Sequence, residues 1–125
     1  MNALKVIKAM LTPSIRATPA DCMARVREGS ALLVDVREAS EWGGGFARSA
    51  ALLPLSDLKG ARNQWAGFLS RAGDRELLLY CAAGARAGMA AGILAGEGFK
   101  AANAGGFCDW VAAGWPVENL STERP

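Results

Sequence analysis

The sequence predicts an α/β domain built on a mainly parallel central sheet, and two patterns carry this prediction. Residues 31–36 and 76–80 are short, almost wholly apolar runs, as is typical of strands that are buried on both faces of a parallel sheet. Runs of this kind alternate along the chain with segments of helical periodicity. We therefore expect about five short strands, with helices on both faces of the sheet.

The first half of the chain carries clear signals for the ends of its elements. Thr18 is a good helix-capping residue, Pro19 suits the first helical turn, and Gly29 suits a helix end. Pro54 lacks an N–H group and marks the end of a strand. The elements expected in this half are a helix over residues 18–28, a strand over 31–36, a helical turn over 38–42 and a strand over 50–55.

The second half of the chain continues the alternation of helices and strands. Trp65, Phe68 and Leu69 recur at helical spacing, and Gly73 follows them as a helix end. A segment rich in Gly and Ala then follows an apolar strand and is expected to be helical. The elements expected in this half are a helix over residues 61–72, a strand over 76–80, a helix over 87–97, a weak strand over 100–103 and a last helix over 105–113.

The length and charge of the chain bound its organisation and its partners. At 125 residues the chain fits one domain, which we place at residues 14–119, followed by a tail over 120–125. Residues 1–13 are expected to form an amphipathic helical extension that packs on the domain or mediates self-association, with lipid-surface binding as the alternative. Lys5 and Lys8 interrupt its apolar residues, which argues against a membrane span. The net charge is only +2 and the basic residues are scattered, so no nucleic-acid partner is expected.

The cysteine and histidine counts restrict the chemistry that the chain can perform. The chain has three cysteines, Cys22, Cys81 and Cys108, and no histidine. An odd count without paired spacing is typical of a reducing compartment, and we expect a cytoplasmic protein. Without histidine the chain cannot build a Ser-His-Asp or Cys-His pair or a Cys/His zinc site, and neither a metal nor an organic cofactor is expected. A cysteine nucleophile would have to be activated by its electrostatic surroundings.

Cys81 stands where the ligand sites of open α/β sheets are found. It directly follows the strand expected over residues 76–80, and a loop of small residues then leads into a helix. Ligand sites of such sheets lie at the carboxyl ends of strands. The N–H groups of the loop and of the helix start favour a thiolate over a thiol, and Arg86 adds a fixed positive charge. The alternative is a cysteine that only fills the core, but the strand–loop–helix context favours a functional sulfur.

This loop is one of four blocks of residues that occur in a familiar order. The blocks are Asp35-Val36-Arg37-Glu38, the run from Glu41-Trp42 through Gly45 to Pro54, Cys81-x-x-Gly84-x-Arg86 after an apolar strand, and Gly105-Gly106-Phe107-x-x-Trp110 with Gly114-x-Pro116. Together they resemble the rhodanese-like domain family of single-domain sulfurtransferases, over about residues 18–118. The resemblance implies the rhodanese fold, a central, mainly parallel five-stranded sheet with helices on both faces.

The resemblance also implies a reaction. Cys81 would take a sulfane sulfur from thiosulfate, a polysulfide or a persulfide, carry it as a persulfide, and pass it to cyanide, a thiol or a protein acceptor. Arg86 would favour an anionic donor, while Asp35 and Arg37 would support the loop from beneath. The N–H groups of the substrate-binding loop would hold the outer sulfur, and this loop comprises Ala82, Ala83, Gly84, Ala85, Arg86 and Ala87.

The chain departs from the family at Phe46, which stands where the family usually has a histidine, and in the loop, which has no Lys or Arg between Cys81 and Arg86. Thiosulfate is therefore expected to be a poorer donor than a polysulfide or a small persulfide. Two other functions stay open: a catalytically weak binding or sulfur-sensing module and, less favoured, a phosphatase, whose loop would be one residue longer. Cys22 and Cys108 are expected to be packing residues, with the alternative that either resolves a Cys81 persulfide as a disulfide.

Overall fold

A five-stranded parallel sheet forms the centre of the computed structural model, which describes residues 15–120. Neighbouring strands follow the order β1–β6–β5–β2–β4, and all four pairings are parallel. The sheet that the sequence predicted is thus confirmed. The strands are β1 (Ile15–Arg16), β2 (Ala31–Asp35), β4 (Ala51–Leu52), β5 (Glu76–Cys81) and β6 (Ala101–Gly106).

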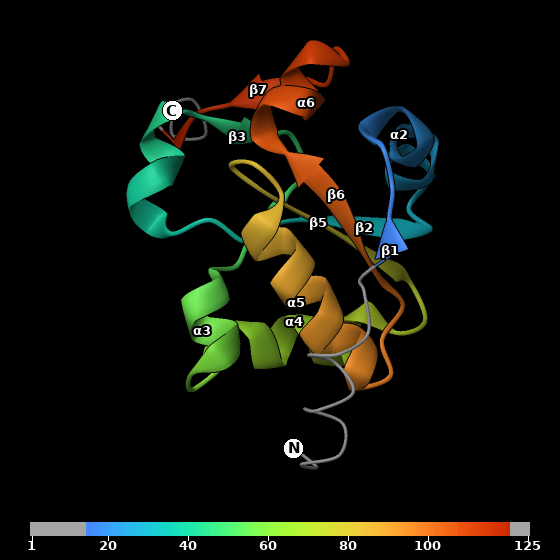
Figure 1. Cartoon of the computed structure of the whole chain (residues 1–125), viewed down its shortest axis with the longest axis vertical. Coiled ribbons are helices and arrows are strands. Elements are labelled where there is room, and N and C mark those ends of the chain that lie inside the picture. Colours follow the sequence, from blue (N-terminus) through green and yellow to red (C-terminus); the bar gives the residue numbers. More distant parts are fainter. Residues whose placement is uncertain (1–14, 121–125) are drawn as a thin grey trace.

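Helices cover both faces of this sheet, as the sequence predicted (Figure 1). One buried cluster joins one face of the sheet to α3, α4 and α5, and a second cluster joins the other face to α2 and α6. Burial on both faces is the usual condition of a parallel sheet. The helical segments are α2 (Pro19–Glu28), the 3-10 helix η1 (Ala39–Gly44), α3 (Leu55–Lys59), α4 (Trp65–Ala72), α5 (Ala85–Gly96) and α6 (Phe107–Ala112).

The central strands show how one apolar run serves two cores. Successive residues of a strand point to opposite faces of the sheet. In β5, Leu77 and Leu79 pack into the first cluster, whereas Leu78 and Tyr80 pack into the second, and all four are fully buried. β2 pairs with β5 so that Asp35 lies opposite Tyr80. This register brings the carboxyl ends of the two central strands together.

Helix α2 has the end signals that the sequence predicted. The Thr18 hydroxyl accepts the N–H of Asp21 at 3.3 Å and donates to the Asp21 carboxylate at 2.7 Å. At the other end Gly29 adopts a φ of +83°, and its N–H reaches the carbonyls of Arg25 and Val26. These bonds satisfy backbone groups that a helix leaves without partners at its ends, so local signals alone determine where α2 begins and ends.

The segment between β4 and α4 differs from the prediction. The strand expected over residues 50–55 is reduced to the two residues of β4, and α3 follows it instead. The helix expected over residues 61–72 begins only at Trp65, because the Asp57 carboxylate accepts the N–H groups of residues 63–65. A carboxylate from α3 therefore caps α4, and helical periodicity does not reveal such a contact.

Further differences come from pairing between distant parts of the chain. The sequence did not predict β1, nor the antiparallel pair of β3 (Phe46–Ala47) and β7 (Val117–Glu118). β6 extends as far as Gly106, and α5 begins at Ala85, earlier than predicted. Strands of two residues are too short to show a periodicity of their own, so their partners decide that they form.

Two of the expected segments lie at the chain ends. The helical extension expected over residues 1–13, and the tail expected over 120–125 apart from its first residue, lie outside the described residues. Between residues 15 and 120, no helix is long and apolar enough to cross a membrane.

Candidate active site

Cys81 is the last residue of β5, and its sulfur lies inside the turn that leads into α5. The N–H of Gly84 donates to Sγ at 3.0 Å, and the N–H of Ala87 donates to it at 3.3 Å. Both groups belong to the start of α5, where the helix offers its own N–H groups no acceptor. Donors of this kind stabilise negative charge on sulfur. The turn therefore supplies two backbone N–H donors to the sulfur, in a chain that has no histidine.

The sulfur lies directly beneath the loop that surrounds it. Cys81 itself is only 1% exposed, whereas Ala82, Ala83 and Ala85 are all exposed. The loop around the buried sulfur therefore presents only single methyl groups to solvent at these three positions.

Asn103 of β6 holds the loop from the side. Its Nδ2 donates to the Gly84 carbonyl at 3.0 Å, and its Oδ1 accepts the N–H of Gly105 at 3.0 Å. The bond to Gly84 is buried, so it is shielded from water, whereas the bond to Gly105 is partly buried. Gly84 has a φ of +101°, a conformation that favours glycine. Sequence reasoning missed Asn103, although a single amide among the small residues of β6 was a signal that could have revealed it.

Gly106 lets the end of β6 approach the same loop closely. A Cβ at this residue would lie 2.4 Å from the carbonyl oxygen of Ala82 and 3.2 Å from the Cα of Ala83. Both are backbone atoms, so any side chain at residue 106 would displace the loop. The sequence predicted Gly106 only as part of the start of the last helix. Its contact with the loop was missed because the two segments are far apart in the chain.

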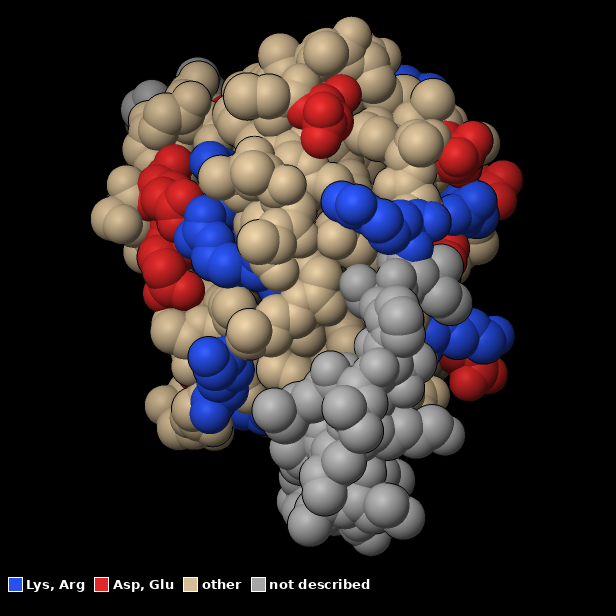
Figure 2. Space-filling model, viewed as in Figure 1, with Lys and Arg blue, Asp and Glu red and all other residues tan. Residues whose placement is uncertain are grey.

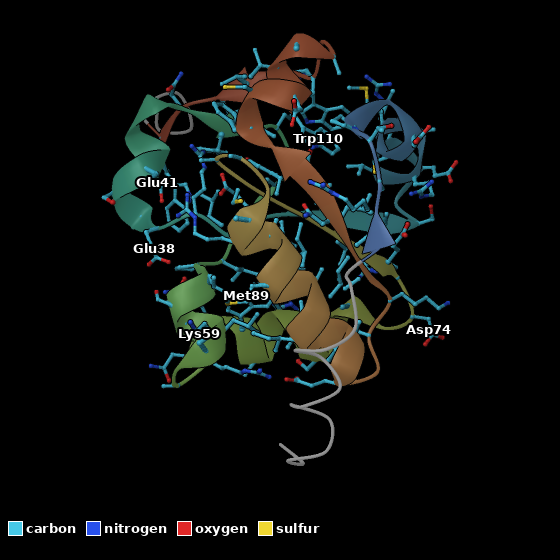
Figure 3. All side chains as sticks on the ribbon, in the orientation of Figure 1. Glu38, Glu41, Lys59, Asp74, Met89 and Trp110 are labelled. Atoms are coloured by element: carbon cyan, nitrogen blue, oxygen red, sulfur yellow. The ribbon has the colours of Figure 1, made fainter. Side chains whose placement is uncertain are left out.

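The guanidinium of Arg86 is bound by Glu41, which lies on η1 beside the start of α5 (Figure 3). Nη1 lies 2.5 Å from Oε1 and Nη2 lies 2.9 Å from Oε2, which is a bidentate geometry. The hydrogen bonds from Arg86 are the main reason why the pKa of Glu41 is lowered to about 2. Glu41 is therefore ionised at neutral pH, and it largely neutralises the charge that the sequence placed at the end of the loop.

Asp35 and Arg37 form a buried ion pair at the carboxyl end of β2. Arg37 Nη2 lies 2.8 Å from Asp35 Oδ2. Burial lowers the pKa of Arg37, but the hydrogen bond and the charge of Asp35 outweigh burial and raise it. Arg37 also donates to the carbonyl of Gly45 at 2.8 Å and to that of Glu41 at 3.4 Å. These bonds hold η1 in place directly. η1 in turn contacts the loop through the ion pair of Glu41 with Arg86.

Tyr80 anchors β3 beneath the site. The N–H of Ala47 donates to the Tyr80 hydroxyl oxygen at 2.9 Å. Burial is the main reason why the pKa of Tyr80 is raised, so the phenol stays neutral. Phe46, which stands where the family usually has a histidine, is buried in the same strand. An apolar side chain at this position thus packs into the domain.

The other two cysteines have different surroundings. Cys22 lies in α2 and is fully buried in the second cluster, and burial is the main reason why the pKa of its thiol is raised. Cys108 is exposed on α6. All three thiols are unpaired, and a resolving role for Cys22 or Cys108 stays a prediction.

Comparisons with known proteins point to one family. Residues 18–113 match the profile of the Rhodanese-like domain. A solved structure of a rhodanese-related protein from Thermoplasma volcanium is 28% identical, with a TM-score of 0.65 over 83% of this chain and 97% of that one. A protein of unknown function from Rhodopseudomonas palustris, titled a possible tyrosine phosphatase, is 26% identical, with a TM-score of 0.70 over 91% of each chain. A rhodanese-like domain protein from Staphylococcus aureus, 22% identical over 84% of this chain and 99% of that one, shares the fold with a TM-score of 0.65.

A search of curated proteins found no match to the chain. The family profile, however, covers most of the chain, from the cap of α2 to the end of α6. The matched region contains Cys81 and every residue that contacts its loop from β6 and η1. The chain therefore belongs to the rhodanese-like domain family.

Proposed function

We propose that the protein is a sulfurtransferase in which Cys81 carries a sulfane sulfur as a persulfide. The observation that most supports this function is that the N–H groups of Gly84 and Ala87 both point at Cys81 Sγ. Such donors stabilise the thiolate that attacks a sulfur donor, and they stabilise it again when the sulfur leaves. Membership of the family supports the same chemistry.

The reaction consists of two displacements on sulfur. In the first, the Cys81 thiolate attacks the sulfane sulfur of the donor, a new S–S bond forms, and the donor group leaves with the electron pair of the broken bond, as sulfite does from thiosulfate. In the second, a thiophilic acceptor attacks the outer sulfur, and Sγ leaves as a thiolate. Since the enzyme returns to its starting state, we expect ping-pong kinetics.

The outer sulfur of the persulfide has donors available at the start of α5. The first bond within the helix runs from the N–H of Gly88 to the carbonyl of Gly84 at 2.9 Å. The N–H groups of Ala85 and Arg86 precede this bond and have no acceptor within the helix. We assign them, with the other amides from Ala82 to Ala87, to the outer sulfur.

The charges around the loop support a preference among donors. Arg86 is the loop's own cation, and Glu41 binds it through both oxygens. Thiosulfate, which carries a charged sulfonate group, therefore gains little from it, whereas a polysulfide or a small persulfide has no sulfonate group to bind. We propose cyanide, a thiol or a protein as acceptor, and a reducing, cytoplasmic setting in which unpaired thiols persist.

The test is the intact mass of the protein after brief incubation with polysulfide or thiosulfate, followed by cyanide. Wild type is expected to gain one sulfur atom and to release it as thiocyanate, while Cys81→Ala does neither. The matched control is Cys108→Ala, which removes the exposed thiol and should load and release sulfur like wild type. If wild type gains no sulfur from any donor, Cys81 is not a sulfur carrier.

A second candidate function is a binding or sulfur-sensing module, which the near-complete burial of Cys81 favours. Alkylation separates the two functions. In a Cys108→Ala background, a catalytic Cys81 should react with iodoacetamide far faster than Cys22, and at a pH where an ordinary thiol is still protonated. If Cys81 is as inert as Cys22, the binding module is the better description.

A phosphatase is the third candidate, because one similar structure is titled a possible tyrosine phosphatase. Phosphate would need the guanidinium of Arg86, which Glu41 occupies. A leaving group would need an acid to protonate it, and the low pKa of Glu41 leaves that carboxyl ionised. We expect wild type not to hydrolyse p-nitrophenyl phosphate. Hydrolysis that is present in wild type and lost in Cys81→Ala would instead place the phosphatase above the sulfurtransferase.

A further inference from the structure

An open groove of about 690 Å³ lies beside the Cys81 loop. It runs between β1, the start of α2, the end of β6 and α6, and its polar lining comes from Arg16, Thr18, Asp21, Asn103 and Asp109. Its volume falls within the range of pockets that hold small organic molecules, roughly 300–1,000 Å³. Figure 2 shows basic side chains on this face of the molecule, near the start of α2, and an isolated acidic group over α6.

Arg16 connects this groove to the reactive sulfur. A Cβ on Gly84 would lie 3.4 Å from Nη2 of Arg16, and the N–H of Gly84 is 3.0 Å from Cys81 Sγ. Within one residue the N and Cβ positions are about 2.5 Å apart, so Nη2 of Arg16 lies within about 9 Å of Sγ. A molecule as small as an amino acid can therefore span the distance from Arg16 to the sulfur.

The charged side chains that line the groove differ in whether they already have hydrogen-bond partners. Arg16 is exposed, and its side chain forms no hydrogen bond or ion pair with any residue between 15 and 120. The two acids hold helix ends: Oδ2 of Asp21 accepts from the Thr18 hydroxyl, and Oδ2 of Asp109 accepts from the Gly106 N–H. Each acid keeps a second carboxylate oxygen for another donor. The groove thus offers two carboxylates and one cation that has no partner among residues 15–120.

We propose that this groove binds the amino-acid end of a low-molecular-mass thiol or persulfide, with its carboxylate at Arg16 and its ammonium group at the carboxylates of Asp21 and Asp109. One cation with two carboxylates suits a zwitterion better than a simple anion. The sulfur of the bound molecule then lies within reach of Cys81. The proposal rests on the proposed function and names the substrate class for it.

The transfer step at this site balances without an added oxidant or reductant. The thiolate of the bound molecule attacks the outer sulfur of the Cys81 persulfide and forms a new S–S bond. The bond between Sγ and the outer sulfur breaks, and its electron pair stays on Sγ as the thiolate. With a bound persulfide as donor, the same step runs in reverse.

The test uses four small thiol acceptors that differ in which charged groups they carry. Cysteine has both groups, 3-mercaptopropionate has the carboxylate, cysteamine has the ammonium group, and 2-mercaptoethanol has neither. The protein is loaded with polysulfide, freed of excess reagent and mixed with each acceptor, and loss of the sulfur is followed by intact mass. The ratio of the variant's rate to the wild-type rate is compared between acceptors, because this ratio cancels the intrinsic reactivity of each thiol.

For Arg16→Ala, we expect this ratio to be lower for cysteine and 3-mercaptopropionate than for the other two acceptors, by roughly three- to tenfold. For Asp109→Asn, which keeps an oxygen to accept the N–H of Gly106, the ratio should be lower for cysteine and cysteamine, by roughly two- to fivefold. The matched control is Arg48→Ala, which removes an exposed arginine outside the groove and should give the same ratio for all four acceptors.

Three results would overturn the inference in different ways. If Arg16→Ala gives one ratio for all four acceptors, the groove does not recognise a carboxylate, although loading of wild type still supports the sulfurtransferase. If only Asp109→Asn fails to discriminate, the assignment of the ammonium group is wrong. If wild type loads no sulfur at all, the proposed function fails and the groove proposal fails with it.

Discussion

Cys22 and Cys81 are both buried, yet the structure treats their thiols differently. Their exposed fractions are 0% and 1%, so water is excluded from both alike. The charges beside them are also alike, because each has an arginine nearby that a glutamate binds. These pairs are Arg25 with Glu76 beside Cys22, and Arg86 with Glu41 beside Cys81.

The difference lies in the backbone N–H groups. Sγ of Cys81 accepts from two of them, whereas the polar contact of the Cys22 sulfur is Arg25 Nη2 at 3.9 Å. Cys22 lies within α2, whose interior N–H groups are bonded to carbonyls of the same helix. Burial then raises the pKa of the Cys22 thiol. Burial and a nearby paired arginine are thus common to both cysteines, whereas the turn from β5 into α5, with its backbone N–H donors, distinguishes Cys81.

The largest effect that tests this comparison comes from replacing each cysteine. Cys81→Ser should lower the rate of thiocyanate formation from polysulfide and cyanide by at least about a thousandfold, because it removes the nucleophile. Cys22→Ala should leave this rate close to wild type while lowering the free energy of unfolding by about 1 kcal/mol, because it opens a small void in the second cluster. Loss of activity in Cys22→Ala, measured on folded protein, would break the comparison.

A smaller effect is expected when the loop is displaced and the cysteine kept. In Gly106→Ala the new methyl group meets the Ala82 carbonyl, which should lower the free energy of unfolding by about 1–3 kcal/mol and slow sulfur transfer. Gly43→Ala is the matched control, since a Cβ there meets nothing within 4 Å. Urea denaturation and thiocyanate formation measure the two effects. Equal behaviour of the two variants would show that the loop's position does not matter.

Removing the side support of the loop should have a more modest effect. Asn103→Ala leaves the partly buried Gly105 N–H without its acceptor and the Gly84 carbonyl without one of its donors. We expect the free energy of unfolding to fall by about 1–2 kcal/mol, and the alkylation rate of Cys81 to move toward that of Cys22. Asn63→Ala, at an exposed residue, is the control. If the alkylation rate is unchanged in Asn103→Ala, the reactivity of the Cys81 thiol does not depend on the support that Asn103 gives to the loop.

The smallest effect concerns the paired arginine. The pKa of Glu41 is lowered from its ordinary 4.5 to about 2, so its ion pair with Arg86 stabilises the fold fully above about pH 4.5 and ceases to do so as the pH falls to about 2. Since both side chains are about one-third exposed, Glu41→Gln should lower the free energy of unfolding by no more than about 1 kcal/mol at neutral pH. This difference from wild type should shrink as the solution is acidified. If the difference in the free energy of unfolding is independent of pH, the ionised Glu41 carboxylate is not the source of this stabilisation.

The sequence by itself determined the features whose causes are local. Apolar runs define β2 and β5 because burial on both faces demands them, and Thr18 with Gly29 determines the ends of α2 because these residues satisfy the helix's own backbone. The order of strand, small-residue loop and helix indicated that Cys81 stands at the carboxyl end of a strand, and it does. These inferences needed no knowledge of distant contacts.

Only the tertiary structure decided what surrounds the sulfur. Asn103 and Gly106 shape the loop from another strand, and Glu41 neutralises the Arg86 that the sequence had assigned to an anionic donor. Arg16, from the edge strand, has no ion-pair partner within residues 15–120 and lies in a groove beside the loop. The partners in each of these contacts are separated by many residues, so their meeting depends on strand order and register. The physical reason is that hydrogen bonds and ion pairs act over a few ångströms, and only the folded sheet brings these groups so close.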